Sequence, residues 1–80
     1  MITVRYFAGA RAAAGGLTDE QLPASTLDGV VDALVARHGE RLAVVLKVAS
    51  FLVDGLTCHD RQAVLSDGST VDVLPPFAGG

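Results

Sequence analysis

The chain has 80 residues, of which half are hydrophobic and 19% are charged, and its net charge at pH 7 is −3. These values fit one small globular domain and exclude a disordered chain. The six Lys and Arg residues are scattered, no apolar stretch has the length of a membrane span and the first residues do not resemble a signal peptide, so we expect no nucleic-acid partner, no membrane partner and a cytoplasmic location.

The first 23 residues predict two strands joined by a short turn. Residues 2–8 alternate between apolar and other side chains, which is typical of a strand with one buried face. Residues 9–16 are rich in alanine and bracketed by glycines, so we expect at most a short helical turn there. Residues 17–23 predict a second strand that ends at proline.

A helix is expected next. Ser25 or Thr26 is suited to cap its first turn, and Gly39 is a natural stop. The apolar residues between them recur at helical spacing. They are Leu27, Val30, Val31, Leu34 and Val35. His38 lies in the last turn, where the helix dipole favours a positive charge. Residues 40–48 predict another helical turn.

The second half predicts two or three more strands. Residues 50–54 form a third strand that is closed by the turn signal Asp54-Gly55. Residues 58–64 predict a short strand or extended piece, and residues 70–74 predict the last strand. The predicted order gives an α+β domain with a mixed sheet of four to five strands packed on one main helix.

The last six residues are the most informative part of the sequence. They are Pro75, Pro76, Phe77, Ala78, Gly79 and Gly80. Two prolines favour an extended, stiff chain, whereas terminal glycines pack nothing. A tail of this kind is suited to present its own carboxylate in a narrow channel. We therefore predict a domain over residues 1–76 and a flexible diglycine tail over residues 77–80.

Two segments resemble a known family. Residues 2–8 and, more closely, residues 67–80 are similar to the MoaD/ThiS family of ubiquitin-like sulfur carriers, above all to its MoaD branch, the small subunit of molybdopterin synthase. The resemblance implies a β-grasp (ubiquitin-like) fold. It also implies that a MoeB-like, ubiquitin-activating-like adenylyltransferase uses ATP to adenylate the carboxylate of Gly80, which then becomes a thiocarboxylate.

In that family the thiocarboxylate donates its sulfur to the molybdopterin precursor, cyclic pyranopterin monophosphate, within a MoaE-like large subunit. The resemblance therefore implies a subunit that is not catalytic alone and holds no permanently bound cofactor. Three alternatives stay open: a sulfur carrier for thiamine or cysteine synthesis, a ubiquitin-like protein modifier, and an interaction domain with an inert tail. Pro75-Pro76 favours the molybdopterin branch, since thiamine carriers usually lack the diproline.

Strand alternation also predicts a partner surface. If Ile2, Val4 and Tyr6 face the helix, Phe7 faces away from it together with Leu52 and Leu74. We expect these three side chains and Phe77 to form an apolar patch beside the tail, which is typical of a docking surface. The alternative is that Phe7 belongs to the core or that a loop covers the patch.

No motif predicts independent catalysis or a metal site. The sequence contains no catalytic Ser-His-Asp pattern and no metal-ligand spacing. Cys58 and His59 are adjacent, and on a strand they would point to opposite faces, which is poor geometry for a shared site. Cys58 is instead expected to be a small, half-buried apolar residue.

Overall fold

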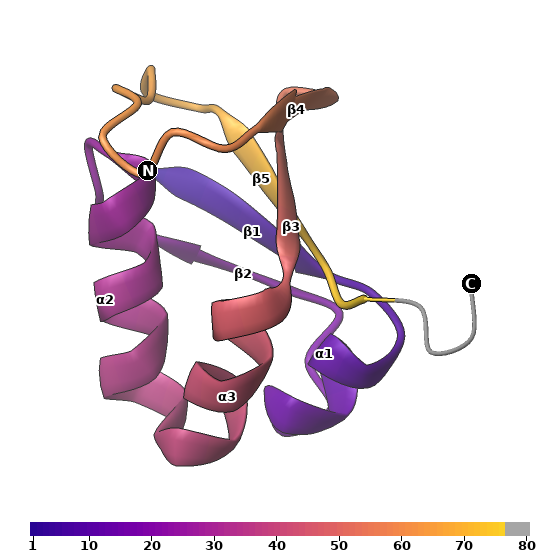
Figure 1. Cartoon of the computed structure of the whole chain (residues 1–80). Helices are drawn as coiled ribbons and strands as arrows, with labels where there is room; N and C mark the ends of the chain where they lie inside the picture. The colour runs from indigo at the N-terminus through magenta and orange to yellow at the C-terminus, as the bar shows by residue number, and fades with distance from the viewer. Residues whose placement is uncertain (77–80) are drawn as a thin grey trace.

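The computed structural model describes residues 1–76, which form a five-stranded sheet and three helices. Figure 1 shows the helices packed beside the sheet. The elements in chain order are β1 (Ile2–Tyr6), α1 (Gly9–Ala13), β2 (Asp19–Leu22), α2 (Leu27–His38), α3 (Glu40–Val48), β3 (Ser50–Val53), β4 (Leu56–Cys58) and β5 (Thr70–Leu74). The expected α+β class is therefore confirmed.

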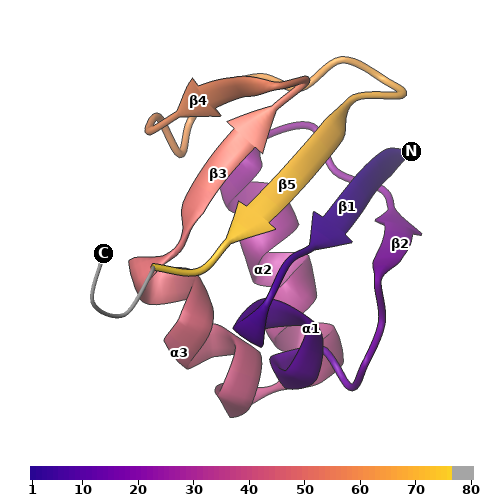
Figure 2. The same ribbon diagram turned by 90° about the vertical axis from the view of Figure 1, so that its right-hand side faces the viewer.

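The sheet is mixed, and its last strand in sequence is its central one. The strand order is β2-β1-β5-β3-β4. β1 and β5 pair in parallel, whereas the other three neighbours are antiparallel. Figure 2 shows β1, β5 and β3 side by side, with α2 and α3 on the far face of the sheet. This arrangement is the β-grasp fold.

The core lies between the sheet and the helices. β1 and β5 direct their apolar residues to this side, as the alternation predicts. Ile2, Val4, Tyr6, Val71 and Val73 are all at most 1% exposed. From α2 and α3 the core receives Leu27, Val30, Val31, Leu34, Leu42 and Leu46. Burial of these side chains, each contributing roughly 1.5–3 kcal/mol, fixes which face of the sheet is internal.

The two longer helices have clear boundaries. The Thr26 hydroxyl accepts a hydrogen bond from the Gly29 backbone N–H at 3.0 Å and caps α2. α2 ends where Gly39 adopts φ 78°, a conformation that favours glycine. α3 extends over nine residues, so the expected single turn at 40–48 underestimated this helix.

Two strand predictions are corrected by the structure. β1 ends at Tyr6 and not at residue 8, because Ala8 has φ 51° and leads into α1. β4 covers Leu56–Cys58, whereas the extended piece was expected at 58–64. Asp54 and Gly55 both have positive φ, as in a two-residue hairpin turn, so the strand that pairs with β3 must begin directly after them.

Candidate functional site

The predicted tail leaves the domain from the middle of the sheet. Leu74, the last residue of β5, pairs with Ser50 at the start of β3. Pro75 is half-buried and Pro76 is exposed. Four predicted site residues, Phe77, Ala78, Gly79 and Gly80, lie outside the described residues. β5 is the central strand, so the chain leaves the domain between its neighbours, at the end of the sheet where β3 begins.

The outer face of the sheet has an ion pair at its centre. Arg5 Nε donates to Asp72 Oδ1 at 2.6 Å, and its second nitrogen donates to Asp72 Oδ2 at 2.8 Å. The Asp72 side chain is only 7% exposed, although α2 and α3 lie on the other face of the sheet (Figure 2). A two-point contact between guanidinium and carboxylate holds both groups in a fixed geometry. The sequence pattern gave no sign of this pair.

Apolar side chains surround the ion pair. Leu52 lies opposite Asp72 in the β3–β5 register, and Phe7 donates its backbone N–H to the carbonyl of Val73 at 3.3 Å. Phe7 is therefore next to the end of β5, where Leu74 lies. Phe7, Leu52 and Leu74 are each half-buried. The helices α2 and α3 lie on the other face of the sheet (Figure 2).

Two guanidinium groups flank the ring of Phe7. The Arg5 carbon Cζ lies 5.7 Å from the ring centroid and that of Arg11 lies 5.8 Å from it. Arg11 Nε also donates to the carbonyl of Tyr6 at 2.9 Å, which fixes the side chain against the strand. Cations at this distance from an aromatic face are attracted to it. We define the outer patch as Arg5, Phe7, Arg11, Leu52, Asp72 and Leu74.

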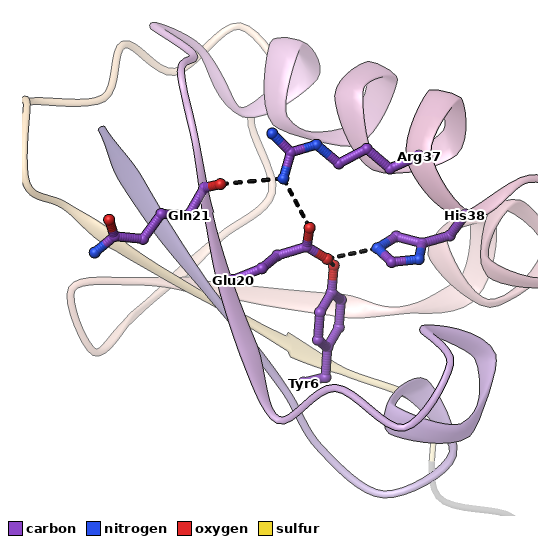
Figure 3. Close-up of polar contacts among 5 residues, drawn as sticks. All are labelled: Tyr6, Glu20, Gln21, Arg37 and His38. Carbon is purple, nitrogen blue, oxygen red and sulfur yellow. Dashed lines mark hydrogen bonds and ion pairs between the residues drawn. The ribbon is translucent and has the colours of Figure 1, made fainter.

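A second polar cluster ties α2 to β2, and Figure 3 shows it. Tyr6 Oη donates to Glu20 Oε2 at 2.5 Å, and His38 Nε2 lies 2.5 Å from the same oxygen. Arg37 donates to Glu20 Oε1 at 2.8 Å and to the carbonyl of Gln21 at 3.1 Å. Glu20 and His38 are 12% and 14% exposed in their side chains. The residues of this polar cluster come from β1, β2 and α2, so their spacing in the sequence did not reveal the cluster.

The electrostatics of this cluster favour an ionised Glu20. Burial alone would raise the pKa of the carboxyl, but hydrogen bonds from Tyr6, His38 and Arg37 outweigh burial and hold that pKa below its ordinary value. Burial first, and then the hydrogen bond to Glu20, raise the pKa of Tyr6 well above its ordinary value. We assign the cluster a structural role, because it joins the end of α2 to the sheet.

The region of Cys58 and His59 differs from the strand geometry expected for it. β4 ends at Cys58, so His59 lies beyond the strand and both side chains line the same pocket. Cys58 is half-buried against the core, as predicted. Within residues 1–76 no group of three His, Cys, Asp or Glu side chains is arranged to hold a metal ion.

A comparison with models of protein families shows to which family the chain belongs. The model of the ThiS family matches residues 4–80. The chain belongs to the ThiS family. This membership makes it a ubiquitin-like sulfur-carrier protein in the broad sense, in agreement with the resemblance seen in the two terminal segments. No match to a curated protein was found.

Solved structures support the fold. A chain of the Amycolatopsis orientalis BexX/CysO complex is similar with a TM-score of 0.84 at 22% identity, with 100% of each chain covered. SAMP1, the small archaeal modifier protein 1 of Methanosarcina acetivorans, has a TM-score of 0.84 at 21% identity, with coverage of 99% of this chain and 95% of that chain.

A third similar structure is a chain in the complex of subunits 1 and 2 of the molybdopterin-converting factor from Helicobacter pylori 26695. Its TM-score is 0.75 at 23% identity, with 99% of this chain and 97% of that chain covered. At these identities the matches show the fold alone, and that fold is the predicted β-grasp. Two of the three similar structures are complexes of the matched chain's own protein with another protein.

Within residues 1–76 the longest helix, α2, has twelve residues, and none of the described helices has the length and apolarity that a membrane span requires.

Proposed function

We propose that this chain is the small, sulfur-carrying subunit of a molybdopterin synthase and that Gly80 is its reactive residue. The carboxylate of Gly80 attacks the α-phosphorus of ATP in an activating enzyme, and an acyl-adenylate forms while pyrophosphate leaves. A hydrosulfide equivalent then attacks the acyl carbon and AMP leaves. The product is a thiocarboxylate, which carries the sulfur to the molybdopterin precursor.

Adenylation solves a chemical problem of the tail. A free carboxylate is a poor electrophile, because its negative charge resists attack by a second anion. Joining it to AMP removes this charge and supplies a good leaving group. The chain itself holds no ATP in this scheme, since the activating partner binds the nucleotide. The contribution of the chain is to place one carboxylate in the reacting geometry.

One observation carries the proposal: in a chain of the ThiS family, Pro75-Pro76 is followed, after Phe77 and Ala78, by Gly79-Gly80. The central strand β5 leads into these prolines. A stiff segment after a fixed strand loses little conformational entropy when it enters an enzyme, which favours docking of the tail. The molybdopterin branch is preferred over other sulfur carriers because of the diproline.

The outer patch supports the partner part of the proposal. Phe7, Leu52 and Leu74 lie on the side of the sheet that α2 and α3 leave free, and Leu74 is six residues from Gly80. Partly exposed apolar side chains beside charged groups are typical of a protein-binding site. We propose that a MoeB-like adenylyltransferase and a MoaE-like large subunit dock here, with Phe77 extending the surface.

The decisive experiment measures the intact mass of the protein. The purified chain is incubated with a MoeB-like enzyme, ATP and sulfide, and the product is then mixed with a MoaE-like subunit and the pterin precursor. Exchange of one oxygen for sulfur, followed by loss of the sulfur as molybdopterin forms, is the expected result. No mass change, with a known carrier modified in parallel, would contradict the proposal.

Matched tail variants sharpen this experiment. Deletion of Gly80, or addition of one residue after it, is expected to abolish sulfur loading and to leave the melting temperature nearly unchanged. A large loss of stability would show that the tail is structural. Thiocarboxylation without transfer to the pterin would favour another sulfur-transfer pathway, and conjugates with other proteins would favour a modifier.

A further inference from the structure

A pocket with basic lining residues opens at the start of β3, the neighbour of the strand β5 that leads to the tail. It has a volume of about 160 Å³ and lies between the end of α3, the start of β3 and the segment after β4. Its polar lining comes from Lys47, Ser50, Cys58, His59 and Arg61. A second cavity of about 200 Å³ adjoins it and shares Lys47 and Arg61.

The charge of the pocket is unusual for this chain. The net charge of the protein is −3, yet three of its eight Lys, Arg and His residues line this one pocket. None of the described residues that line either cavity is acidic. The lining therefore carries two permanent cations, Lys47 and Arg61, and, among the described residues, no carboxylate, which favours an anion.

The partners of these cations show which charges are already compensated. One Arg61 nitrogen donates to Asp28 at 2.9 Å, whereas its Nε is buried and has no hydrogen-bond partner among residues 1–76. Lys47 forms no ion pair within the same range. Lys47 is thus left for a ligand, together with the third Arg61 nitrogen, which takes part in neither contact, and a carboxylate supplies two acceptor oxygens.

The position of β5 identifies the nearest such carboxylate. Ser50 lines the pocket and pairs with Leu74, so the end of β5 lies one strand spacing, about 4.8 Å, from the pocket wall. Six residues follow Leu74, and they span up to about 20 Å when extended. The C-terminal carboxylate therefore has ample reach to the pocket.

We propose that the pocket binds the unactivated Gly80 carboxylate of its own chain, through Lys47 and Arg61, as a resting position of the tail. The binding does not depend on sulfur chemistry, but its consequence rests on the proposed function. The activating enzyme must withdraw the carboxylate before it can adenylate it. Loss of the pocket charge is then expected to make loading faster and not slower.

The test compares the native protein with the same chain that carries a C-terminal carboxamide. The two forms differ only in the charge of Gly80. We expect their backbone amide NMR shifts to differ at Lys47, Ser50 and His59, and 0.5 M NaCl to reduce the differences because it screens an exposed pair. Identical shifts at these three residues would overturn the proposal.

Charge variants provide the matched control. In Lys47→Met the shift differences at Ser50 and His59 are expected to fall about threefold or more, since one of the two cations is removed. Arg41→Met removes a cation from the same helix outside the pocket and is expected to leave them unchanged. Equal effects of both variants would overturn the assignment.

Added acetate tests the other occupant. Acetate is expected to shift Lys47 and His59 in the carboxamide form and to act more weakly on the native form, whose pocket the tail occupies. Equal effects on both forms would show a site for free anions and overturn the tail assignment. These measurements need no enzyme, so failure of the sulfur-loading assay leaves their outcome unaffected.

Discussion

β1 and β5 carry very different side chains on their two faces. Toward the helices they place only apolar groups and Tyr6, all at most 1% exposed. Toward the outside they place Arg5 and Asp72, with Phe7 and Leu74 at the strand ends. The inner face is covered by α2 and α3, whereas none of the helices within residues 1–76 lies over the outer face (Figure 2).

This contrast separates the residues that make the fold from those available for recognition. The inner face needs only apolar side chains of suitable volume, and many sequences meet this requirement. The outer face instead holds a nearly buried carboxylate in a two-point contact and an aromatic ring with two cations near it. Fixed charges in defined positions discriminate between partners more than they add affinity.

The largest expected effect comes from a cavity on the inner face. Ile2→Ala removes buried methyl groups from a side chain that is 1% exposed and is expected to cost about 2–5 kcal/mol of unfolding free energy. Thr3→Ala, on the outer face of the same strand, is expected to cost less than about 1 kcal/mol. Urea denaturation measures both. Similar losses would break the contrast between the faces.

The next effect concerns binding and not folding. Phe7→Asp on the outer patch is expected to weaken binding to the activating enzyme by about tenfold or more, because it places a charge where an apolar ring docks. The cooperative unfolding transition is expected to remain. Val64→Asp, an apolar position that is 83% exposed outside the outer patch, serves as the control. An unfolded Phe7 variant would assign Phe7 to the core.

A smaller effect on stability is expected in the polar cluster around Glu20. Glu20→Gln weakens the hydrogen bonds from Tyr6, Arg37 and His38 and is expected to cost about 1–2 kcal/mol at pH 7, as measured by urea denaturation. The pKa of Glu20 is lowered by folding, so its stabilising contribution is complete above its ordinary pKa and is lost as the pH falls through the folded value.

The acid limb of the stability curve checks the sign of this effect. Below pH 4.5, the ordinary value for Glu20, the native protein is expected to lose stability more steeply than Glu20→Gln. The two curves therefore converge in acid. Parallel curves between pH 6 and pH 3 would show that the carboxylate charge contributes nothing to the cluster.

The smallest effect is expected for Tyr6→Phe. This variant keeps the buried ring and removes only the hydroxyl that donates to Glu20 at 2.5 Å. The expected loss is about 1 kcal/mol, the typical net value of one hydrogen bond. Thermal unfolding measures it. A loss as large as that of Ile2→Ala would mean that the hydroxyl organises the core and is not an edge contact.

Much of the fold was predictable because its signals are local. Alternation in residues 2–8 identified the inner face of β1, and the spacing of apolar residues identified α2. The prediction misplaced β4 because this edge strand has only three residues and its apolar residue Leu56 is 75% exposed. Its sequence therefore shows no alternation of buried apolar and exposed polar side chains. The signal that places it is the Asp54-Gly55 turn, whose geometry fixes the next residue as a strand partner.

The site was predictable only in part, since its polar contacts join distant segments. The alternation of side chains along the strands indicates, from the sequence alone, that Phe7, Leu52 and Leu74 face the same side of the sheet. Arg5 and Asp72 are 67 residues apart in the sequence, and their pairing depends on the register between β1 and β5. Glu20 contacts His38 only when α2 packs on the sheet. No single segment contains the information for either contact.

The central place of β5 has a consequence for how the protein is made. Before residues 70–74 leave the ribosome, β1 pairs only with β2 and β3 pairs only with β4, and nothing joins these two hairpins within the sheet. Two-stranded hairpins of this kind are marginal in water. We therefore expect the complete sheet to form only once residues 70–74 have been made. A translation product that stops before them lacks the strand that joins the two pairs, and we expect it to be more sensitive to proteolysis.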